Sequence, residues 1–241
     1  MATCLLVNFD GALTANQFIF WKTAFKRVLK KMTSTCDKAH QHLLATFERD
    51  KRAHQMLVFN GQQFLRKTNR FSLLEYLCRA IAGQQLSTKA ASTIWGRVKI
   101  LHQASDLPFK LFLQRANFDE LRSCGLSGAK TKTITGLARA DSQGELSARK
   151  LKTLDHEDLI NHLCQFWGVG QWTAEMCAIG YFKMTDVWSE GDVGLKNAIS
   201  FLYEGDSEKA DKAVSISSPF RSYWSLHLWS ALDNGFFKAE Q

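Results

Sequence analysis

Proline, strand patterns and long apolar runs are all scarce in this sequence of 241 residues. Its two prolines, Pro108 and Pro219, each come just before an apolar segment of helical period, where the first turn of a helix tolerates proline. Alternating apolar and polar residues are nearly absent, whereas apolar residues recur at intervals of three and four. No stretch reaches the roughly 18 apolar residues of a membrane-spanning helix. We therefore predict an all-α intracellular protein without a membrane partner.

The sequence also lacks the cysteine and histidine spacings that hold metal ions. None of its six cysteines forms a Cys-x-x-Cys pair, and no histidine stands near one at metal-ligand spacing. We predict that all six are reduced thiols in the core: Cys4, Cys36, Cys78, Cys124, Cys164 and Cys177. The formal charge of +8 favours an acidic partner such as nucleic acid, although charge alone does not establish one.

Several polar residues stand where helices are expected to begin. Ser72 with Glu75 three residues later forms the pattern of a capping box. Further N-caps are predicted at Ser87, Asn117, Ser127, Asp155 and Ser218. About ten or more helices joined by short links are expected.

Residues 1–39 differ in kind from the rest of the chain. An apolar opening is followed by residues 18–32, an amphipathic pattern with lysine and arginine at its end. This pattern indicates either a helix that packs on the main body or an arm that contacts DNA. We assign residues 1–39 to an N-terminal helical extension of unknown role and residues 40–241 to one domain, since no low-complexity linker divides them.

Residues 155–181 predict two helices joined by a tight turn that contains Gly168, Val169 and Gly170. Glycines on either side of one apolar residue allow the turn to expose backbone N–H groups beside the positive end of the following helix. Such a turn can bind a phosphate, but a Gly-x-Gly corner can also serve only for packing.

Wider segments around this turn carry a family resemblance. Residues 163–175 (LCQFWGVGQWTAE) and 186–195 (DVWSEGDVGL) resemble the hairpin and the aspartate loop of the helix-hairpin-helix DNA glycosylase superfamily. Residues 77–87 (LCRAIAGQQLS) resemble its segment that probes the base stack. Residues 121–130 and 219–229 also stand where the superfamily has matching segments. The chain is most similar to the 3-methyladenine DNA glycosylase II family, over roughly residues 40 to 232.

The resemblance implies a fold and a function. The fold is a bundle of two interleaved helical lobes with the active site in the cleft between them. The implied function is a DNA glycosylase of base excision repair that flips alkylated purines, such as 3-methyladenine and 7-methylguanine, out of duplex DNA and hydrolyses their bond to the sugar. We expect a monomer that needs no cofactor, cytoplasmic in a bacterium and nuclear in a eukaryote.

Asp192 is the candidate catalytic carboxylate. By position alone it is an ordinary helix N-cap, and the neighbouring Glu190 competes with it, but the family has its aspartate where Asp192 stands. Breaking an N-glycosidic bond builds positive charge on the sugar, which a carboxylate stabilises. A helix N-terminus favours a charged carboxylate, so capping and catalysis are compatible.

Two departures from related enzymes predict a monofunctional glycosylase. Superfamily members that cut the strand have a Schiff-base lysine two residues after the second hairpin glycine, where this chain has Trp172. The endonuclease III relatives carry a C-terminal four-cysteine iron–sulfur loop, and no cysteine follows Cys177 here. Water is therefore expected to complete the displacement.

The resemblance also implies the residues that bind the base. Aromatic faces attract a cationic alkylated purine. Trp172 and Trp229 match positions where the family presents indoles to its pocket, and Trp188 is a weaker third candidate. Met176 stands where the family has an aromatic residue, which predicts a pocket of different shape or selectivity. Core packing is the alternative for each tryptophan.

The remaining predicted contacts concern DNA and a cation. Gln85, with Gln84 beside it, aligns with the residue that fills the vacated base stack, although glutamine there could instead cap a helix. Phosphates are expected on the hairpin turn, assisted by lysines that could equally be a solvated face. The predicted backbone contacts are Gly168, Val169, Gly170, Lys130 and Lys132. A structural monovalent cation is expected on the main-chain carbonyls of Cys164, Phe166 and Val169.

The sequence leaves two other functions open. The first is a non-catalytic helix-hairpin-helix protein that binds DNA, since residues 188–191 (WSEG) depart from relatives that have proline before the aspartate. The second is a glycosylase for another damaged or mismatched base. The absence of the Schiff-base lysine and of the iron–sulfur cysteines argues against the commonest versions of the second.

Overall fold

The computed structural model describes residues 34–65 and 71–238, and helices are the regular secondary structure in these ranges. The prediction of an all-α fold is confirmed. The elements in chain order are α2 (Thr35–Thr46), α3 (Lys51–Asn60), α4 (Leu73–Gly83), α5 (Thr88–Ala104), α6 (Phe109–Arg115), α7 (Phe118–Ser123), α8 (Gly128–Ser142), α9 (Ala148–Leu151), α10 (His156–Cys164), α11 (Gln171–Gly180), α12 (Val193–Leu202), α13 (Ser207–Ile216), α14 (Arg221–Asp233) and the short 3-10 helix η1 (Phe236–Lys238).

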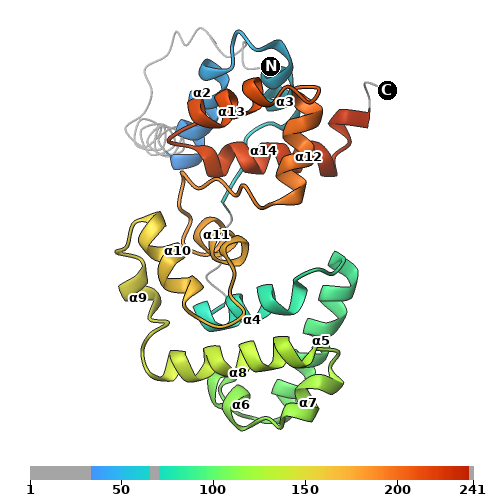
Figure 1. Ribbon diagram of the computed structural model, residues 1–241, viewed down its shortest axis with the longest axis vertical. Coiled ribbons are helices and arrows are strands. Elements are labelled where there is room, and N and C mark those ends of the chain that lie inside the picture. Colours follow the sequence, from blue (N-terminus) through green and yellow to red (C-terminus); the bar gives the residue numbers. More distant parts are fainter. Residues whose placement is uncertain (1–33, 66–70, 239–241) are drawn as a thin grey trace, which may run out of the picture.

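The helices form two lobes, as predicted (Figure 1). One lobe contains α4 to α11 and has its own hydrophobic core. The other combines α2 and α3 with α12, α13, α14 and η1, so segments from the two ends of the described chain share its core. Leu65 and Trp229 pack against both cores and lie where the lobes meet.

The N-terminal boundary of the domain needs a correction. The predicted border between residues 39 and 40 falls inside α2, whose Ala39 and Leu43 are fully buried in the second core. Ser34 caps this helix through a hydrogen bond from the backbone N–H of Asp37. The domain therefore includes the chain from Ser34 onward. The expected helix over residues 18–32 lies outside the described residues.

Most predicted helix starts match the structure. The side chain of Ser72 accepts the Glu75 N–H at 3.1 Å. The Glu75 side chain does not accept the Ser72 N–H in return, so the predicted capping box is only half formed. The other confirmed caps are Ser87, Asn117, Ser127 and Asp155. The prediction for Ser218 is wrong, because Phe220 occupies the N-cap of α14 and the Ser218 hydroxyl donates to Asp186 instead.

The five described cysteines are free thiols. Cys78, Cys124 and Cys177 are buried, as predicted, and burial raises the pKa of each. The prediction is wrong for Cys164, which is exposed at the end of α10, and Cys36 is half-buried. Across residues 34–65 and 71–238, no cluster of His, Cys, Asp and Glu side chains has the arrangement of a metal site. No helix in those same ranges has the length and hydropathy needed to cross a membrane.

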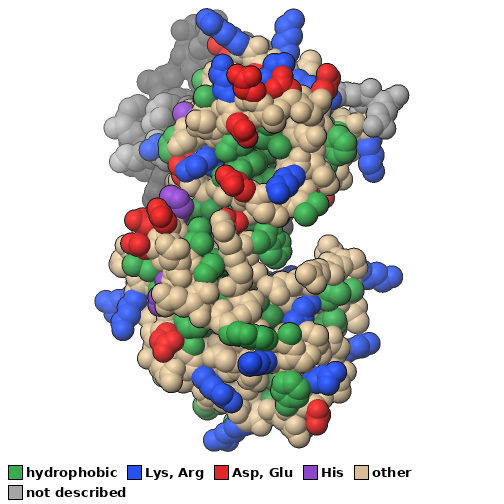
Figure 2. Space-filling view, viewed as in Figure 1, with side chains coloured by type: hydrophobic (Ala, Val, Ile, Leu, Met, Phe, Trp, Pro, Cys, Tyr) green, Lys and Arg blue, Asp and Glu red, His purple; other side chains and the backbone are tan. Residues whose placement is uncertain are grey.

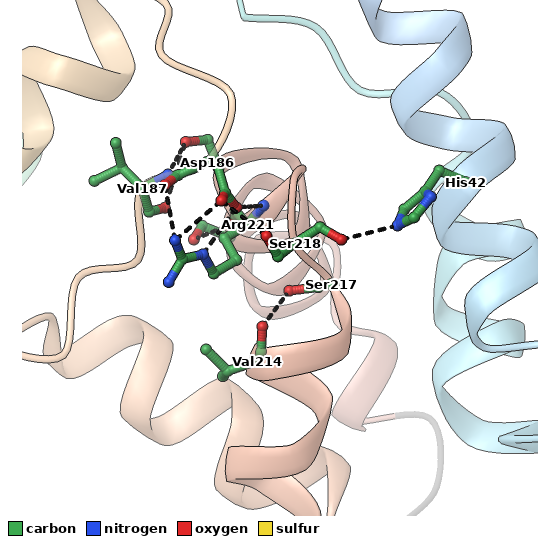
Figure 3. A network of polar contacts seen from close by, with 9 residues as sticks. His42, Asp186, Val187, Val214, Ser217, Ser218 and Arg221 are labelled. Carbon is green, nitrogen blue, oxygen red and sulfur yellow. Dashed lines mark hydrogen bonds and ion pairs between the residues drawn. The ribbon is translucent and has the colours of Figure 1, made fainter. Parts of the chain in front are cut away.

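The segment between α11 and α12 crosses from one lobe to the other and is clamped to the start of α14 (Figure 3). The Arg221 guanidinium donates from Nε to Asp186 Oδ1 at 2.8 Å and from Nη2 to Oδ2 at 3.0 Å. Ser222 adds two hydrogen bonds of 3.0 Å each. Its backbone N–H donates to the Thr185 carbonyl, and its hydroxyl oxygen accepts the N–H of Val187. These contacts fix the stretch of chain that leads to Asp192.

The charge state of Asp186 depends on this clamp. Burial acts to raise the pKa of Asp186, but hydrogen bonds from Arg221 and Ser218 outweigh it and hold this pKa below its ordinary value of 3.8. A carboxyl group with a lowered folded-state pKa stabilises the protein above its unfolded pKa. That stabilisation is lost as the pH falls through the folded pKa.

We predict that Asp186→Asn lowers the free energy of unfolding by about 1–3 kcal/mol at pH 7, since it removes a charge-assisted pair. The difference from the wild type should shrink as the pH falls below the ordinary pKa of 3.8. Urea unfolding between pH 7 and pH 3 measures both effects. Asp141→Asn is the control, because Asp141 lies 3.4 Å from Lys110 in a looser pair and should cost less. An equal loss at every pH would contradict this account of the clamp.

Candidate active site

The hairpin predicted from the glycines is formed by α10, α11 and the turn between them. Gly168 has a φ of +82°, in the left-handed region that favours glycine. A Cβ added to Gly168 would lie 2.0 Å from Thr133 Oγ1 on α8, so the turn approaches α8 too closely for any side chain. Val169 is buried in the core and its N–H donates to the Phe166 carbonyl at 3.0 Å. Gly170 is the N-cap of α11.

Asp192 begins α12 as its N-cap and is 8% exposed. Its Oδ1 accepts the backbone N–H of Leu195 at 2.8 Å, in the ordinary capping geometry. Its own N–H donates to the Ser189 carbonyl at 3.2 Å, which closes the turn before the helix. The carboxylate is thus fixed by the backbone on both sides.

Two tryptophans from different helices bind the same carboxylate. Trp172 on α11 donates from Nε1 to Asp192 Oδ2 at 2.7 Å, and Trp229 on α14 donates from Nε1 to Oδ1 at 3.0 Å. Gly194 allows the second contact, because a Cβ there would lie 3.3 Å from Trp229 Nε1. The tryptophans were predicted from sequence as partners for a base. Their hydrogen bonds to the carboxylate were not predicted.

The carboxylate lies where the lobes meet, because its partner Trp229 packs against both cores and its other partner, Trp172, belongs to the first lobe. Figure 2 shows the molecular surface hollowed between the two lobes, and α11 and α12 lie beside this hollow in Figure 1. Trp172 is 39% exposed, whereas Asp192 retains only a small accessible area. This combination gives a shielded negative charge with an exposed aromatic residue beside it.

Glu175 is a buried carboxylate that sequence reasoning missed. It is 3% exposed on α11, accepts from Gln171 Nε2 at 2.9 Å and accepts a short hydrogen bond from the Ser189 hydroxyl. Because the Ser189 carbonyl in turn accepts the Asp192 N–H, Glu175 ties α11 to the aspartate turn. The sequence did contain a signal for this residue, because Glu175 is an acidic residue among apolar neighbours in the segment that forms α11.

The other predicted pocket residues do not bind the carboxylate. Its hydrogen bonds come from Trp172, Trp229 and Leu195. The half-buried Met176 packs against the first core, and its carbonyl accepts from the Tyr76 hydroxyl.

Trp188 lies at two other hollows of the surface. It lines hollows of about 570 and 640 Å³ together with Glu190 and Arg221. Glu190, the competing candidate for the catalytic carboxylate, is exposed there.

The two predicted glutamines have different surroundings. Gln84 Nε2 donates to Thr173 Oγ1 at 2.8 Å and lies 3.4 Å from the Gly168 carbonyl, so its amide faces the hairpin. Gln85 is exposed and has a φ of +57°. Gln84 therefore bridges helices, while Gln85 projects from the corner.

The two predicted lysines also differ, although both lie on α8. Lys130 Nζ donates to main-chain carbonyls at the end of α4, which does not support its predicted phosphate contact. Lys132 is exposed, with Nζ 4.4 Å from the ring centroid of Trp167. Trp167 is 55% exposed and directly precedes Gly168. Lys132 thus places a charge beside the hairpin turn, on a lobe where Figure 2 shows more Lys and Arg than Asp and Glu.

Comparisons with known proteins agree with this geometry. No family model matches the chain. The chain is 28% identical to DNA-3-methyladenine glycosylase 1 of Schizosaccharomyces pombe, over 83% of its length and 89% of the relative's. A solved 3-methyladenine DNA glycosylase of that organism, in complex with abasic DNA, aligns with a TM-score of 0.71 at 27% identity, over 81% of this chain and 97% of the other.

A bacterial structure is also similar. The crystal structure of the DNA-3-methyladenine glycosidase of Bacillus halodurans aligns with a TM-score of 0.68 at 30% identity, and the match covers 83% of this chain and 90% of that one. The chain belongs to the DNA-3-methyladenine glycosylase family. The resemblance inferred from the hairpin and aspartate segments is confirmed. The two-lobed helical architecture of this family member follows from the same likeness.

In this glycosylase family member, we predict that Gly168→Ala distorts the hairpin. The new Cβ would overlap Thr133, and alanine is strained at a φ of +82°. Thermal melting should show a destabilised protein, and binding to duplex DNA should weaken. Gly170→Ala is the matched control, because its φ is −87° and a Cβ there meets no atom within 4 Å. Equal effects of the two substitutions would contradict the role assigned to the close approach at Gly168.

Proposed function

We propose that this protein is a monofunctional DNA glycosylase of base excision repair that releases alkylated purines, 3-methyladenine and 7-methylguanine, from duplex DNA. The observation that carries the proposal is the Asp192 carboxylate, shielded from water and held by two indole N–H groups where the lobes meet. The site draws on both lobes of a single chain, which supports action as a monomer.

The chemical role of Asp192 follows from its surroundings. As the base departs, positive charge develops on the sugar, and a fixed negative charge stabilises it with little reorganisation. Three N–H donors bind the carboxylate and hold it in place: those of Leu195, Trp172 and Trp229. Partial exclusion of water strengthens the attraction to the sugar. Water then completes the displacement and leaves an abasic site.

Base selection is assigned to the same indoles. A purine alkylated on its ring is cationic, so it is attracted to the electron-rich faces of Trp172 and Trp229. Because each indole N–H is occupied by Asp192, the rings are oriented by the residue that acts on the sugar. Met176, where relatives have an aromatic residue, gives a softer wall. Alkylation already weakens the glycosidic bond, so modest assistance is sufficient. Trp188 makes no hydrogen bond to Asp192 and lines other hollows of the surface, so it is not assigned to the base pocket.

DNA is held, in this proposal, by backbone groups and one lysine. N–H groups of Gly168 and Gly170 bind a phosphate at the positive end of α11, whereas the N–H of Val169, which was also predicted to take part, is already bonded to the Phe166 carbonyl. Lys132 adds a cation next to this turn. Gln85 fills the space that the extruded nucleotide leaves in the stack.

A structural monovalent cation on the hairpin is a further part of the proposal. Its ligands would be the main-chain carbonyls of Cys164, Phe166 and Val169. The Phe166 carbonyl already accepts the Val169 N–H, and a carbonyl oxygen has a second lone pair for an ion. The ion would only support the turn that holds the phosphate.

We predict that Asp192→Asn abolishes release of methylated purines and leaves duplex binding nearly unchanged. Asparagine is as good an N-cap as aspartate, so α12 should persist, but the charge is lost and an amide N–H₂ would face an indole donor. Asp206→Asn is the control, since Asp206 caps α13 through the Lys209 N–H, away from the candidate site.

The assay incubates each protein with methylated duplex DNA and identifies the freed bases by chromatography. Release of 3-methyladenine and 7-methylguanine by the wild type supports the proposal and ranks its substrates. Binding without release would indicate a non-catalytic DNA-binding protein. Release of other bases from damaged or mismatched duplexes would instead indicate a different specificity. Unchanged release by Asp192→Asn would contradict the assigned mechanism.

We predict that borohydride traps no covalent complex between the wild type and methylated duplex DNA, because an indole cannot form a Schiff base. Trp172→Lys should lose purine release without efficient strand cutting, since the lysine would replace a donor to Asp192 and lack the geometry for attack. Gel electrophoresis under denaturing conditions detects both outcomes. A trapped wild-type complex would refute the monofunctional assignment.

A further inference from the structure

The corner that ends α4 is bound by a lysine from another helix. Lys130 on α8 donates from Nζ to the carbonyl oxygens of Ala82 at 3.0 Å and Gln84 at 2.7 Å. The last carbonyls of a helix lack partners within it and carry the negative end of its dipole. The ammonium of Lys130 therefore acts as a charged C-cap supplied from outside α4.

The same corner is fixed to the hairpin through a side chain. The amide of Gln84 donates to the hydroxyl of the buried Thr173 on α11 and approaches the Gly168 carbonyl. Helices α4, α8 and α11 therefore meet at Gln84, whose carbonyl and side chain are both engaged. The next residue along the chain is Gln85.

Gln85 leaves this anchored corner in an uncommon conformation. Its φ of +57° is costly for a residue other than glycine and persists where neighbouring contacts impose it. Its side chain is exposed, and among the described residues none is recorded as its hydrogen-bond partner. Two contacts hold the chain next to Gln85: Lys130 donates to the Gln84 carbonyl, and the Gln84 amide approaches the Gly168 carbonyl of the hairpin.

We propose that Lys130 is a positioning residue for base flipping, which holds the α4 corner so that Gln85 can enter the base stack. The inference rests on the proposed function for the role of Gln85. Inserting a side chain between stacked bases costs free energy, so the loop that carries the side chain must be held rigidly in position. Lys130 acts through the loop and does not touch DNA, whereas the exposed Lys132 binds phosphate.

The first test compares Lys130→Met with Lys132→Met, two residues apart on one helix. A duplex that carries 2-aminopurine at the flipped position reports unstacking by its fluorescence, and this readout requires no base release. For Lys130→Met, we expect the fluorescence rise and the single-turnover release rate to fall by roughly tenfold or more, with the dissociation constant for duplex within about twofold of wild type. For Lys132→Met, we expect weaker binding to duplex DNA, and the slope of log affinity against log salt concentration should be smaller in magnitude by about one. When the DNA is saturated with this variant, the 2-aminopurine fluorescence should rise as in the wild type.

The second test asks whether Lys130 acts through Gln85. The effects of Lys130→Met and Gln85→Ala on flipping should be non-additive, so that the double variant is no worse than Gln85→Ala. A lesion opposite an abasic site needs less unstacking and should recover most of the activity of Lys130→Met. Lys130→Gln, which keeps a neutral donor, should fall between wild type and Lys130→Met. It is the variant used if Lys130→Met melts below the assay temperature.

Three results would overturn the proposal. The first is a lower salt slope for Lys130→Met like that of Lys132→Met, which would make Lys130 a phosphate contact. The second is fully additive loss with Gln85→Ala. The third is an equal defect on paired and unpaired lesions. Failure of the proposed glycosylase function is seen separately, as absent base release by a wild type that still unstacks 2-aminopurine.

Discussion

The candidate site depends on one shared interaction, the binding of a single carboxylate by donors from three helices. Asp192 accepts from the backbone of α12, from Trp172 on α11 and from Trp229 on α14. The first of these tryptophans belongs to the lobe built around α4 to α11, and the second packs against both cores. The same hydrogen bonds therefore hold the carboxylate and join parts of both lobes.

Other features maintain this arrangement. The Asp186–Arg221 clamp fixes the crossing segment to α14, and Glu175 fixes the turn before Asp192 to α11. Both are polar contacts in partly or fully buried places, where a lost partner is costly. They act on the position of Asp192 without contacting it, so their substitution should change geometry more than chemistry.

Neighbouring residues of the same type have different surroundings at two places in the structure. Lys130 and Lys132 are two positions apart on α8, yet one ammonium faces carbonyls inside the protein and the other faces an exposed indole. The two glutamines differ in the same way, because Gln84 is hydrogen-bonded to Thr173 of α11 whereas the side chain of Gln85 is exposed. In each pair, a residue bonded to other parts of the protein stands next to an exposed one.

Sequence predicted the local features of this protein better than the contacts between distant segments. The helical period, the caps at Ser72 and Asp155 and the glycine turn depend on residues close in the chain, and the structure confirms them. The buried thiol expected at Cys164 depends on which helix faces which, and that prediction was wrong. The bonds of Lys130 to the end of α4 depend on the same packing and were not predicted. The indole bonds to Asp192 were missed for the same reason, because they join residues 20 and 37 positions apart.

The most direct measurement of the central claim is the affinity of the protein for two abasic duplexes, one with a neutral tetrahydrofuran ring and one with a protonated pyrrolidine ring in place of the sugar. The cationic ring imitates the charge that develops as the base leaves. If the Asp192 carboxylate lies beside that sugar, the wild type should bind the pyrrolidine duplex more tightly than the tetrahydrofuran duplex, and Asp192→Asn should remove this preference. The same preference in both proteins would contradict the account.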